Sequence, residues 1–424
     1  MALEDYLTNT QRCSRCSYCK WIPLAHVKSW RFAKGCPSIA YKKFHSYSAG
    51  GRLAVALSLL KGRISYTDGL MDIVYQCQMD GLCDVSDKIC RYDVEPLEVM
   101  HELRFKLVEE GQLIPQHMAL IDNLRKEDNM MMKPKAERGK WSEGLEIKDI
   151  TKESAEFVFH GGCRIGFDEQ LGKIGRIAIT IFKNTGVDIG ILKGKEESCC
   201  GLKAYDMGYK GELIKYAENN IEAWTNAGVK TVVTACSDCY YAFKNRYPDI
   251  GSKFEVLHVV EFIDRLIKED KIKLTKTIPL TVTYHDPCHL GRLGGRYIPW
   301  QGKVKKTLGQ IVVHEPRKPR SNGANGIYEP PREILQRIPG LKLIEMERVR
   351  EYAWCCGAGG GVMEAYPEFS SWTAKERIEE AKFTGAQAIV TACPWCERNF
   401  IDAVSGNGGK MKVYDIIELV QQAI

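Results

Sequence analysis

The 424-residue sequence has no long apolar run, no large net charge and no evident nucleotide-binding motif. No stretch approaches about 18 uncharged apolar residues, so we expect no membrane span of its own. The first residues lack a basic segment followed by an apolar core, so no secretory signal is expected. The formal net charge of +6 is spread along the chain and does not indicate nucleic-acid binding. No Gly-x-Gly-x-x-Gly follows an expected strand, so a nucleotide cofactor would belong to a partner. The expected location is cytoplasmic, with any peripheral attachment to the inner face of the membrane made through a partner.

Cysteine is what the sequence has in excess, and its 17 cysteines fall into three groups. A disulfide framework is not expected in a reducing compartment, and buried apolar cysteines would be scattered. The grouping therefore indicates metal ligands. The first group has seven members and the others have five each: Cys13, Cys16, Cys19, Cys36, Cys77, Cys83 and Cys90; Cys163, Cys199, Cys200, Cys236 and Cys239; Cys288, Cys355, Cys356, Cys393 and Cys396.

The two groups of five belong to an internal repeat. Each has a Cys-Cys-Gly, at 199–201 and 355–357, and each ends in a Cys-x-x-Cys preceded by Val-Thr-Ala. The doublets are 156 residues apart, whereas Cys163 and Cys288 are only 125 apart. The second repeat must therefore carry an insertion between Cys288 and Cys355. The basic, Pro- and Gly-rich stretch 296–325 fits it, with Lys303, Lys305, Lys306, Arg317, Lys318 and Arg320.

Each repeat is predicted to be α/β. Short apolar runs at 156–160 and 280–284 lead into the first cysteine, and runs at 231–234 and 388–391 lead into the Cys-x-x-Cys pairs, as buried strands do. Between them, Leu213, Ala217, Ile221 and Trp224 recur at helical spacing. Strands alternating with helices predict a mostly parallel sheet, whose ligand-bearing loops gather at the strand ends.

The first 125 residues are predicted to form a mainly helical, ferredoxin-like iron–sulfur module. Cys13-x-x-Cys16-x-x-Cys19 is the spacing that wraps three thiolates around one cubane cluster. Cys36, followed by proline, resembles the fourth cysteine of that motif, which in two-cluster ferredoxins ligates the other cluster.

The second ferredoxin motif is degenerate, because the spacing counted from Cys77 falls on Asp80, Cys83 and Asp87. A carboxylate binds iron less firmly than a thiolate. Asp80 is therefore either a weak ligand of the fourth iron, or that iron position of the cubane lacks a protein ligand. A 3Fe–4S cluster is an alternative. A four-ligand zinc site and loss of the second cluster are the other interpretations. The expected division is Cys13, Cys16, Cys19 and Cys90 for one 4Fe–4S cluster, and Cys36, Cys77, Asp80 and Cys83 for the second.

The expected organisation has four parts. A helical ferredoxin-like module spans 1–125, and a polar, unperiodic linker spans 126–150. The first CCG domain spans 151–275, and the second spans 276–424 with the inserted basic loop 296–325.

Adjacent cysteines suit a larger inorganic core better than one small ion, and five thiolates exceed the four that tetrahedral zinc accepts. The repeated Cys-x(n)-Cys-Cys-Gly-x(n)-Cys-x-x-Cys resembles the cysteine-rich domain pair of the heterodisulfide reductase family. Within it, the nearest type is the large D-type polypeptide, which fuses a two-cluster ferredoxin-like module to this pair. The likeness covers nearly the whole chain. Its most specific segments are His285-Asp-Pro-Cys288-His289-Leu-Gly-Arg292, Tyr328-Glu-Pro-Pro-Arg332 and Trp354-Cys-Cys-Gly-Ala-Gly-Gly-Gly361.

The resemblance implies that each set of five cysteines is catalytic and holds a noncubane 4Fe–4S cluster, with a disulfide split between the two clusters. In some relatives one of the two domains holds zinc instead. It also implies a hetero-oligomeric complex in which flavin, haem or iron–sulfur proteins supply electrons. The alternative is a pure electron relay in a larger complex, such as an acyl-CoA reductase or a hydroxy-acid-oxidising system, without a disulfide substrate of its own.

The sequence pattern does not determine the roles of two histidines and of the basic loop. His285 and His289 flank Cys288 and are candidates either for proton donation or for hydrogen bonding to cluster sulfur. The basic loop is interpreted as a partner-docking or solvated surface rather than a substrate site.

Overall fold

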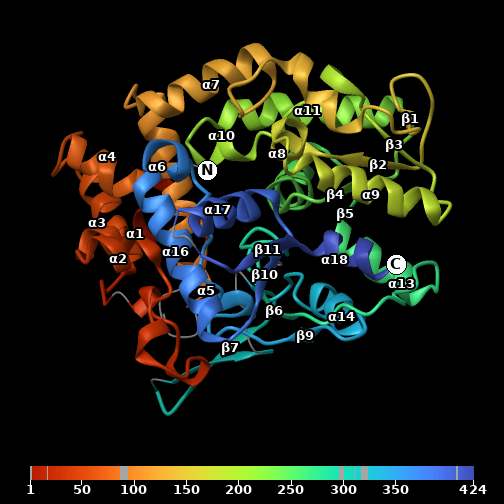
Figure 1. Ribbon diagram of the computed structural model, residues 1–424. Helices are drawn as coiled ribbons and strands as arrows, with labels where there is room; N and C mark the ends of the chain where they lie inside the picture. The colour runs from red at the N-terminus through yellow and green to blue at the C-terminus, as the bar shows by residue number, and fades with distance from the viewer. Residues whose placement is uncertain are drawn as a thin grey trace.

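The computed structural model describes residues 2–16, 18–85, 94–295, 300–309, 311–316, 323–406 and 409–424. Figure 1 shows the N-terminal helices at the left, a first α/β unit at the upper right and a second α/β unit below the centre. Most of the buried apolar residues of all three parts join one hydrophobic core. No helix in the described ranges is long and apolar enough to cross a membrane. The predicted α/β class is confirmed.

The N-terminal part is helical, and polar caps and prolines set where several of its helices begin. Pro37 occupies the first turn of α2 directly after Cys36, where its missing N–H costs nothing. Ser48 and Thr67 accept hydrogen bonds from the first turns of α3 and α4. The helices are α1 (Leu7–Arg12), α2 (Pro37–Lys42), α3 (Ala49–Leu60), α4 (Asp68–Tyr75), α5 (Leu82–Val85), α6 (Pro96–Glu109) and α7 (Pro115–Glu127).

The segment 126–150, predicted as a linker, is a packed part of the first α/β unit. It forms the 3-10 helix η7 (Lys135–Ser142), which packs on α8 (Gly162–Phe167), and the edge strand β1 (Lys148–Asp149). Asn129 and Arg138 are fully buried, because their side chains bond to backbone carbonyls and to Glu197. These buried hydrogen bonds and the ion pair hold the segment against the first α/β unit, and the composition of the segment does not reveal them.

The first sheet is parallel throughout, in the order β1-β3-β2-β4-β5. Its strands are near-continuous apolar runs, as expected for strands covered by helices on both faces. The remaining strands are β2 (Phe157–His160), β3 (Ile189–Ile191), β4 (Thr231–Thr234) and β5 (Glu255–His258). The helices are α8, α9 (Gly172–Asn184), α10 (Leu202–Asp206), α11 (Lys210–Asn226), α12 (Ser237–Tyr241) and α13 (Val259–Lys268).

The second sheet repeats this topology as β11-β10-β6-β9, again parallel. Each of its strands has a counterpart in the first sheet, with β6 matching β2 and β10 matching β4, as the cysteine repeat predicts. The strands are β6 (Thr281–Tyr284), β9 (Lys342–Leu343), β10 (Ala388–Thr391) and β11 (Lys412–Asp415). The helices are α14 (Glu329–Arg337), α15 (Val362–Ala365), α16 (Pro367–Phe383), α17 (Pro394–Ser405) and α18 (Ile416–Ala423).

The inserted stretch in the second repeat contains a hairpin rather than only a loop. Strands β7 (Lys303–Thr307) and β8 (Ile311–Glu315) pair antiparallel and form a sheet of their own. Lys303, Lys305 and Lys306 are exposed on it. Arg317, Lys318 and Arg320 lie outside the described residues.

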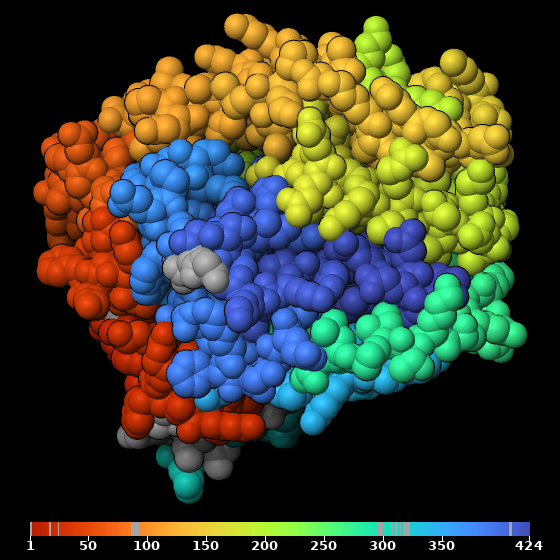
Figure 2. Space-filling view, in the orientation of Figure 1, coloured from red at the N-terminus to blue at the C-terminus, as the bar shows by residue number. Residues whose placement is uncertain are grey.

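The N-terminal part packs closely on the second α/β unit. Figure 2 shows the red N-terminal segments and the blue helices in continuous contact on the face viewed. At this contact the glycine loop 359–361 lies against the backbone of Cys77 and Gln78: a Cβ on Gly360 would meet the Cys77 carbonyl oxygen at 2.5 Å. Arg104, fully buried, donates to both the Cys77 and Gly360 carbonyls, at 2.8 and 2.9 Å.

Candidate metal centres

Both sets of five cysteines lie at the carboxyl edge of their sheets, where parallel strands deliver loops to one place. In each repeat the first cysteine follows β2 or β6. The doublet lies in the connection that follows β3 or β9, and the Cys-x-x-Cys pair opens the helix after β4 or β10. Nine of the ten cysteines are buried, and Cys288 is half-buried.

The five thiols of the first set touch one another in a continuous series. The side chains interact in pairs, Cys163 with Cys199, Cys199 with Cys200, Cys200 with Cys239 and Cys239 with Cys236. Loops that are far apart in sequence therefore deliver a single five-sulfur site.

The second set repeats this series and joins the first. The links run from Cys288 through Cys355, Cys356 and Cys396 to Cys393. A further link joins Cys236 to Cys393, and the Ser237 hydroxyl donates to the Ala392 carbonyl at 2.9 Å beside it. We call this contact between the two Cys-x-x-Cys motifs the seam. The ten predicted cysteines thus form two sites in direct contact.

The glycine of each doublet is required by the backbone. Gly201 has φ +78° and Gly357 has φ +97°, and a Cβ there would meet Leu213 Cα at 2.9 Å or Ser370 O at 2.5 Å. Their N–H groups donate to Cys199 Sγ and Cys355 Sγ, at 3.4 and 3.3 Å. Hydrogen bonds from neighbouring thiols also lower the pKa of Cys200 and of Cys356 to about 6. One thiol of each doublet, Cys200 or Cys356, thus favours the thiolate form that binds metal, whereas the pKa of its neighbour, Cys199 or Cys355, is raised.

Arg138 brings a buried positive charge to the first set. Its guanidinium donates to Cys163 Sγ at 3.5 Å and to Glu197 at 2.9 Å. Glu197 in turn accepts from the Gly161 and Gly162 N–H groups, at 2.8 and 3.0 Å. The cation is therefore held rigidly against the first cysteine of the set.

His289, predicted as a candidate proton donor, bridges the two domains. Its Nδ1 pairs with Asp238 of the first Cys-x-x-Cys at 2.7 Å, and Tyr241 stacks on its ring. Burial disfavours the imidazolium, but the charges of Cys288 and Asp238 outweigh burial and raise the pKa of His289 to about 10. His289 therefore carries its second proton at neutral pH.

A small cavity of about 10 Å³ lies beside the seam and is lined by residues of both domains, among them Asp238, His289, Cys356 and Trp395. Both Arg164 and Lys203, from the first domain, lie over the Trp395 ring, at 4.0 and 3.6 Å. The cavity itself is lined by thiols, the Trp395 ring and the paired side chains of Asp238 and His289.

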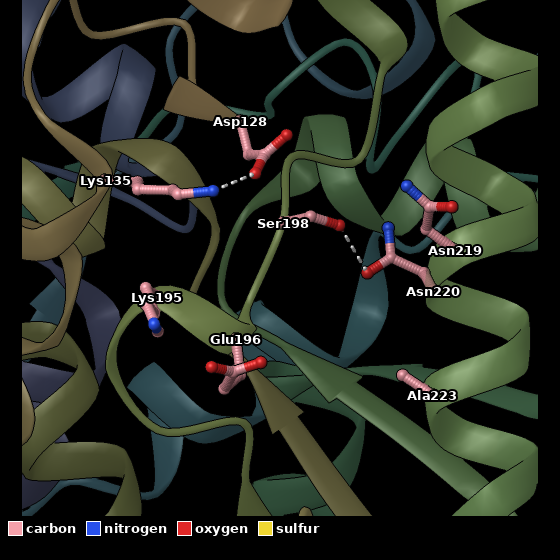
Figure 3. Close-up of a pocket in the computed structure, with 8 residues that line it drawn as sticks. All are labelled: Asp128, Lys135, Lys195, Glu196, Ser198, Asn219, Asn220 and Ala223. Atoms are coloured by element: carbon pink, nitrogen blue, oxygen red, sulfur yellow. Dashed lines mark hydrogen bonds and ion pairs between the residues drawn. The ribbon is translucent and has the colours of Figure 1, made fainter. Parts of the chain in front are cut away.

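A second, polar pocket of about 740 Å³ lies outside the first doublet (Figure 3). Lys135 pairs with Asp128 at 3.3 Å, and Ser198 donates to Asn220, whose amide donates to the Cys199 carbonyl. No cysteine is among its lining residues in the described part of the chain. It touches the first set only through the backbone and does not reach the seam.

Six cysteines of the N-terminal group and Asp80 also gather. The electrostatic neighbours of Cys19 include Cys13, Cys16 and Cys36, and those of Cys83 include Cys19, Cys77 and Asp80. Cys16 is exposed, so this end of the group reaches the surface. Cys90 and Asp87 lie outside the described residues, and the division into two clusters stays a prediction.

Asp80 contacts the second CCG domain as well as the cysteine group. One carboxylate oxygen accepts from the Leu82 N–H at 3.3 Å, and the other lies 3.5 Å from the Arg292 guanidinium. Arg292 is fully buried, with Cys288 and Cys355 among the charges near it. Asp80 as an iron ligand stays a prediction, and its ion pair with Arg292 was not anticipated.

The donors present fit iron–sulfur clusters. Soft thiols, five to a site, suit an iron–sulfur core and exceed the needs of one tetrahedral ion. When bound, such clusters accept and supply single electrons. The residues that sequence reasoning missed are Arg138, Glu197, Asp238 and Arg292. The position of Asp238 inside Cys-Ser-Asp-Cys could have indicated its role, whereas no sequence motif indicated Arg138.

Comparison with known proteins identifies the family. The family model described as "Cysteine-rich domain" (CCG) matches residues 157–244 and 318–401. The chain is similar to the D-type polypeptide of the dihydromethanophenazine:CoB–CoM heterodisulfide reductase of Methanosarcina mazei. The two are 30% identical over 437 aligned residues, which cover 99% of this chain and 95% of that protein.

Other relatives are redox proteins as well. The probable iron–sulfur-binding oxidoreductase FadF of Bacillus subtilis is 27% identical, over 100% of this chain and 56% of that protein. The B-type polypeptide of the fumarate reductase (CoM/CoB) of Methanothermobacter marburgensis is 32% identical, over 66% of this chain and 50% of that protein. The chain belongs to the family of the heterodisulfide reductase D-type polypeptide and is an iron–sulfur oxidoreductase with two CCG cysteine-rich domains.

Proposed function

We propose that the chain passes electrons from two N-terminal clusters to two noncubane 4Fe–4S clusters, one in each CCG domain, which together reduce a disulfide. The observation that carries the proposal is the seam, where Cys236 and Cys393 bring the two five-thiol sites into contact. Two one-electron donors on either side of one bond suit a two-electron cleavage. The balance is R–S–S–R′ + 2 e⁻ + 2 H⁺ → RSH + R′SH.

The surrounding residues have defined parts in this proposal. The first cluster is held by Cys163, Cys199, Cys200, Cys236 and Cys239, and the second by Cys288, Cys355, Cys356, Cys393 and Cys396. The substrate disulfide would lie at the seam, between the two clusters. His289, protonated and anchored by Asp238, stabilises negative charge that develops on a departing thiolate.

The proposed electron path enters at the N-terminal group and reaches the second CCG domain first. Cys16 is exposed and is the natural point for a partner protein to deliver electrons. The loop 77–80 lies against the glycine loop 359–361, which directly follows the second doublet. Partners carrying flavin, haem or iron–sulfur groups in a hetero-oligomeric complex fit this entry point, and the names of several relatives describe components of such enzymes.

A second candidate is a pure relay that has no disulfide substrate. The small size of the cavity beside the seam favours it, since about 10 Å³ is roughly the space of a single water molecule. A relative named EtfAB:quinone oxidoreductase, 27% identical over 81% of this chain, also supports it.

The two candidates differ in one reaction. Anaerobically purified protein with reduced viologen should reduce the mixed disulfide of coenzymes M and B if the enzyme proposal holds, and should not if the chain is a relay. Cys393→Ser should abolish the turnover. Ser237→Ala, which removes only the hydrogen bond to the Ala392 carbonyl, is the matched control and should retain it.

A further inference from the structure

A buried histidine precedes the first cysteine of each repeat by three residues, His160 before Cys163 and His285 before Cys288. In the second domain, a ring nitrogen of His285 and the sulfurs of Cys356 and Cys396 all lie within 4.8 Å of one another. Phe400 contacts the ring edge-on at a centroid distance of 4.8 Å and limits its rotation. His285 therefore faces the second five-thiol site, either as a ligand or as a hydrogen-bond donor.

Arg377 distinguishes these two roles. Its Nε–H donates to His285 Nδ1 at 3.1 Å. A guanidinium offers only donors, so Nδ1 must be the unprotonated acceptor and the ring proton must be on Nε2. A metal ligand needs a lone pair on the coordinating nitrogen, and Nε2 in this tautomer has none to give.

The position of Arg377 is itself fixed. Its Nη1 donates to Glu380 at 2.7 Å and to the Arg348 carbonyl at 2.9 Å. All three side chains are buried, and Arg348 also donates to Glu380.

The other nitrogen of His285 is left without a partner. Nε2 is buried and has no hydrogen-bond acceptor in the described part of the chain. A buried N–H of this kind is rare unless something accepts from it. The unprotonated nitrogen faces Arg377, so the free N–H is the one directed toward the Cys356 and Cys396 sulfurs.

We propose that His285 donates its Nε2–H to the sulfur of the second CCG cluster, and that Arg377 is the positioning residue that locks this tautomer. The inference rests on the proposed function, because it needs a cluster in the second domain. Hydrogen bonds to cluster sulfur raise the reduction potential, since they stabilise the more negative reduced state.

The first domain lacks this arrangement. Neither ring nitrogen of His160 has a hydrogen-bond partner among the described residues, and the nearest acid, Glu197, is 4.0 Å from Nδ1. Aromatic rings of Trp224 and Phe243 pack edge-on against it, and the nearby Arg138 donates to Cys163 and Glu197 rather than to His160. The His–Arg pair therefore tunes one cluster of the two, and His160 is the matched control.

The test uses the full chain, loaded with clusters anaerobically, in four variants. His285→Leu removes the donor, His285→Gln retains an N–H donor, Arg377→Met frees the tautomer, and His160→Leu changes only the first domain. The readouts are iron, sulfide and zinc content and a redox titration followed by electron paramagnetic resonance.

His285→Leu should keep its iron, but one noncubane cluster should become about tenfold harder to reduce. Its reduction potential should therefore fall by about 59 mV, as for a one-electron couple. Arg377→Met should lower the potential of the same cluster. His285→Gln should keep that potential near the wild-type value, and His160→Leu should leave it unchanged. Loss of iron or zinc from both His285 variants would show a ligand and overturn the proposal, as would an unchanged potential in His285→Leu. A wild-type protein with no noncubane signal would instead refute the proposed function.

Discussion

Gly360→Ala tests whether the contact between the Cys77 loop and the second CCG domain carries electrons. Gly360 has φ +62°, and a Cβ there would meet the Cys77 carbonyl oxygen at 2.5 Å and the Gln78 carbonyl carbon at 2.9 Å. Both neighbours are backbone atoms of the loop that carries the N-terminal ligands, so they can give way only if that loop moves. Gly385, with φ +76° and nothing within 4 Å of its Cβ position, is the matched control.

The expected magnitudes follow from these two environments. An L-residue in the left-handed region lowers the free energy of unfolding by roughly 1–2 kcal/mol, and this applies to both variants. Overpacking adds about 1–3 kcal/mol for Gly360→Ala alone. We therefore expect unfolding free energies lower by about 1–2 kcal/mol for Gly385→Ala and by about 2–5 kcal/mol for Gly360→Ala.

Two assays separate the stability effect from the functional one. Denaturant unfolding of the anaerobic, cluster-loaded protein gives the free energies. Rapid-freeze electron paramagnetic resonance after mixing with reduced viologen then follows the arrival of electrons at the CCG clusters. Arrival should be slower in Gly360→Ala than in Gly385→Ala at equal iron content. Equal rates in the two variants would refute the proposed path through the glycine loop.

The remaining predictions concern Arg138, Asp80 and the hairpin. Arg138→Met leaves the buried Glu197 carboxylate without its cation and should lower the unfolding free energy by about 3–5 kcal/mol, measured by denaturant unfolding; a change under about 1 kcal/mol would contradict this. Mild oxidation of the wild type should give a three-iron paramagnetic signal that is absent in Asp80→Cys and permanent in Asp80→Ala, because a carboxylate holds iron weakly; identical spectra would show that Asp80 binds no cluster. Deletion of residues 303–315 should abolish co-purification with partner proteins and leave iron content unchanged, because the exposed basic hairpin is outside the sheets that hold the cysteines; retained co-purification would place docking elsewhere.

Much of the α/β architecture could be predicted because its signals are local. The runs at 231–234 and 388–391 are strands β4 and β10, and the helical spacing of Leu213 to Trp224 lies within α11. The internal repeat predicted matching sheets, and the strand orders agree. Cysteine spacing likewise predicted which thiols would come together in each domain, since each motif follows a strand end.

The features that could not be predicted depend on contacts between distant segments. The edge strands β1 and β9 have two residues each, too few for a periodic pattern. Arg138 lies in a polar stretch whose burial depends on Glu197, 59 residues away. Arg377 lies in α16, and only the fold places it against His285, 92 residues earlier. The seam is of the same kind, because nothing in either repeat alone indicates that Cys236 and Cys393 meet.

The central claim is that this chain holds iron–sulfur clusters at both CCG domains and in its N-terminal part. Iron, acid-labile sulfide and zinc should be measured on protein purified without oxygen. We expect about twelve to sixteen irons per chain, four per cluster, with sulfide to match and no zinc. Fewer than about six irons together with two zincs would contradict it, since both five-thiol sites would then be structural zinc sites.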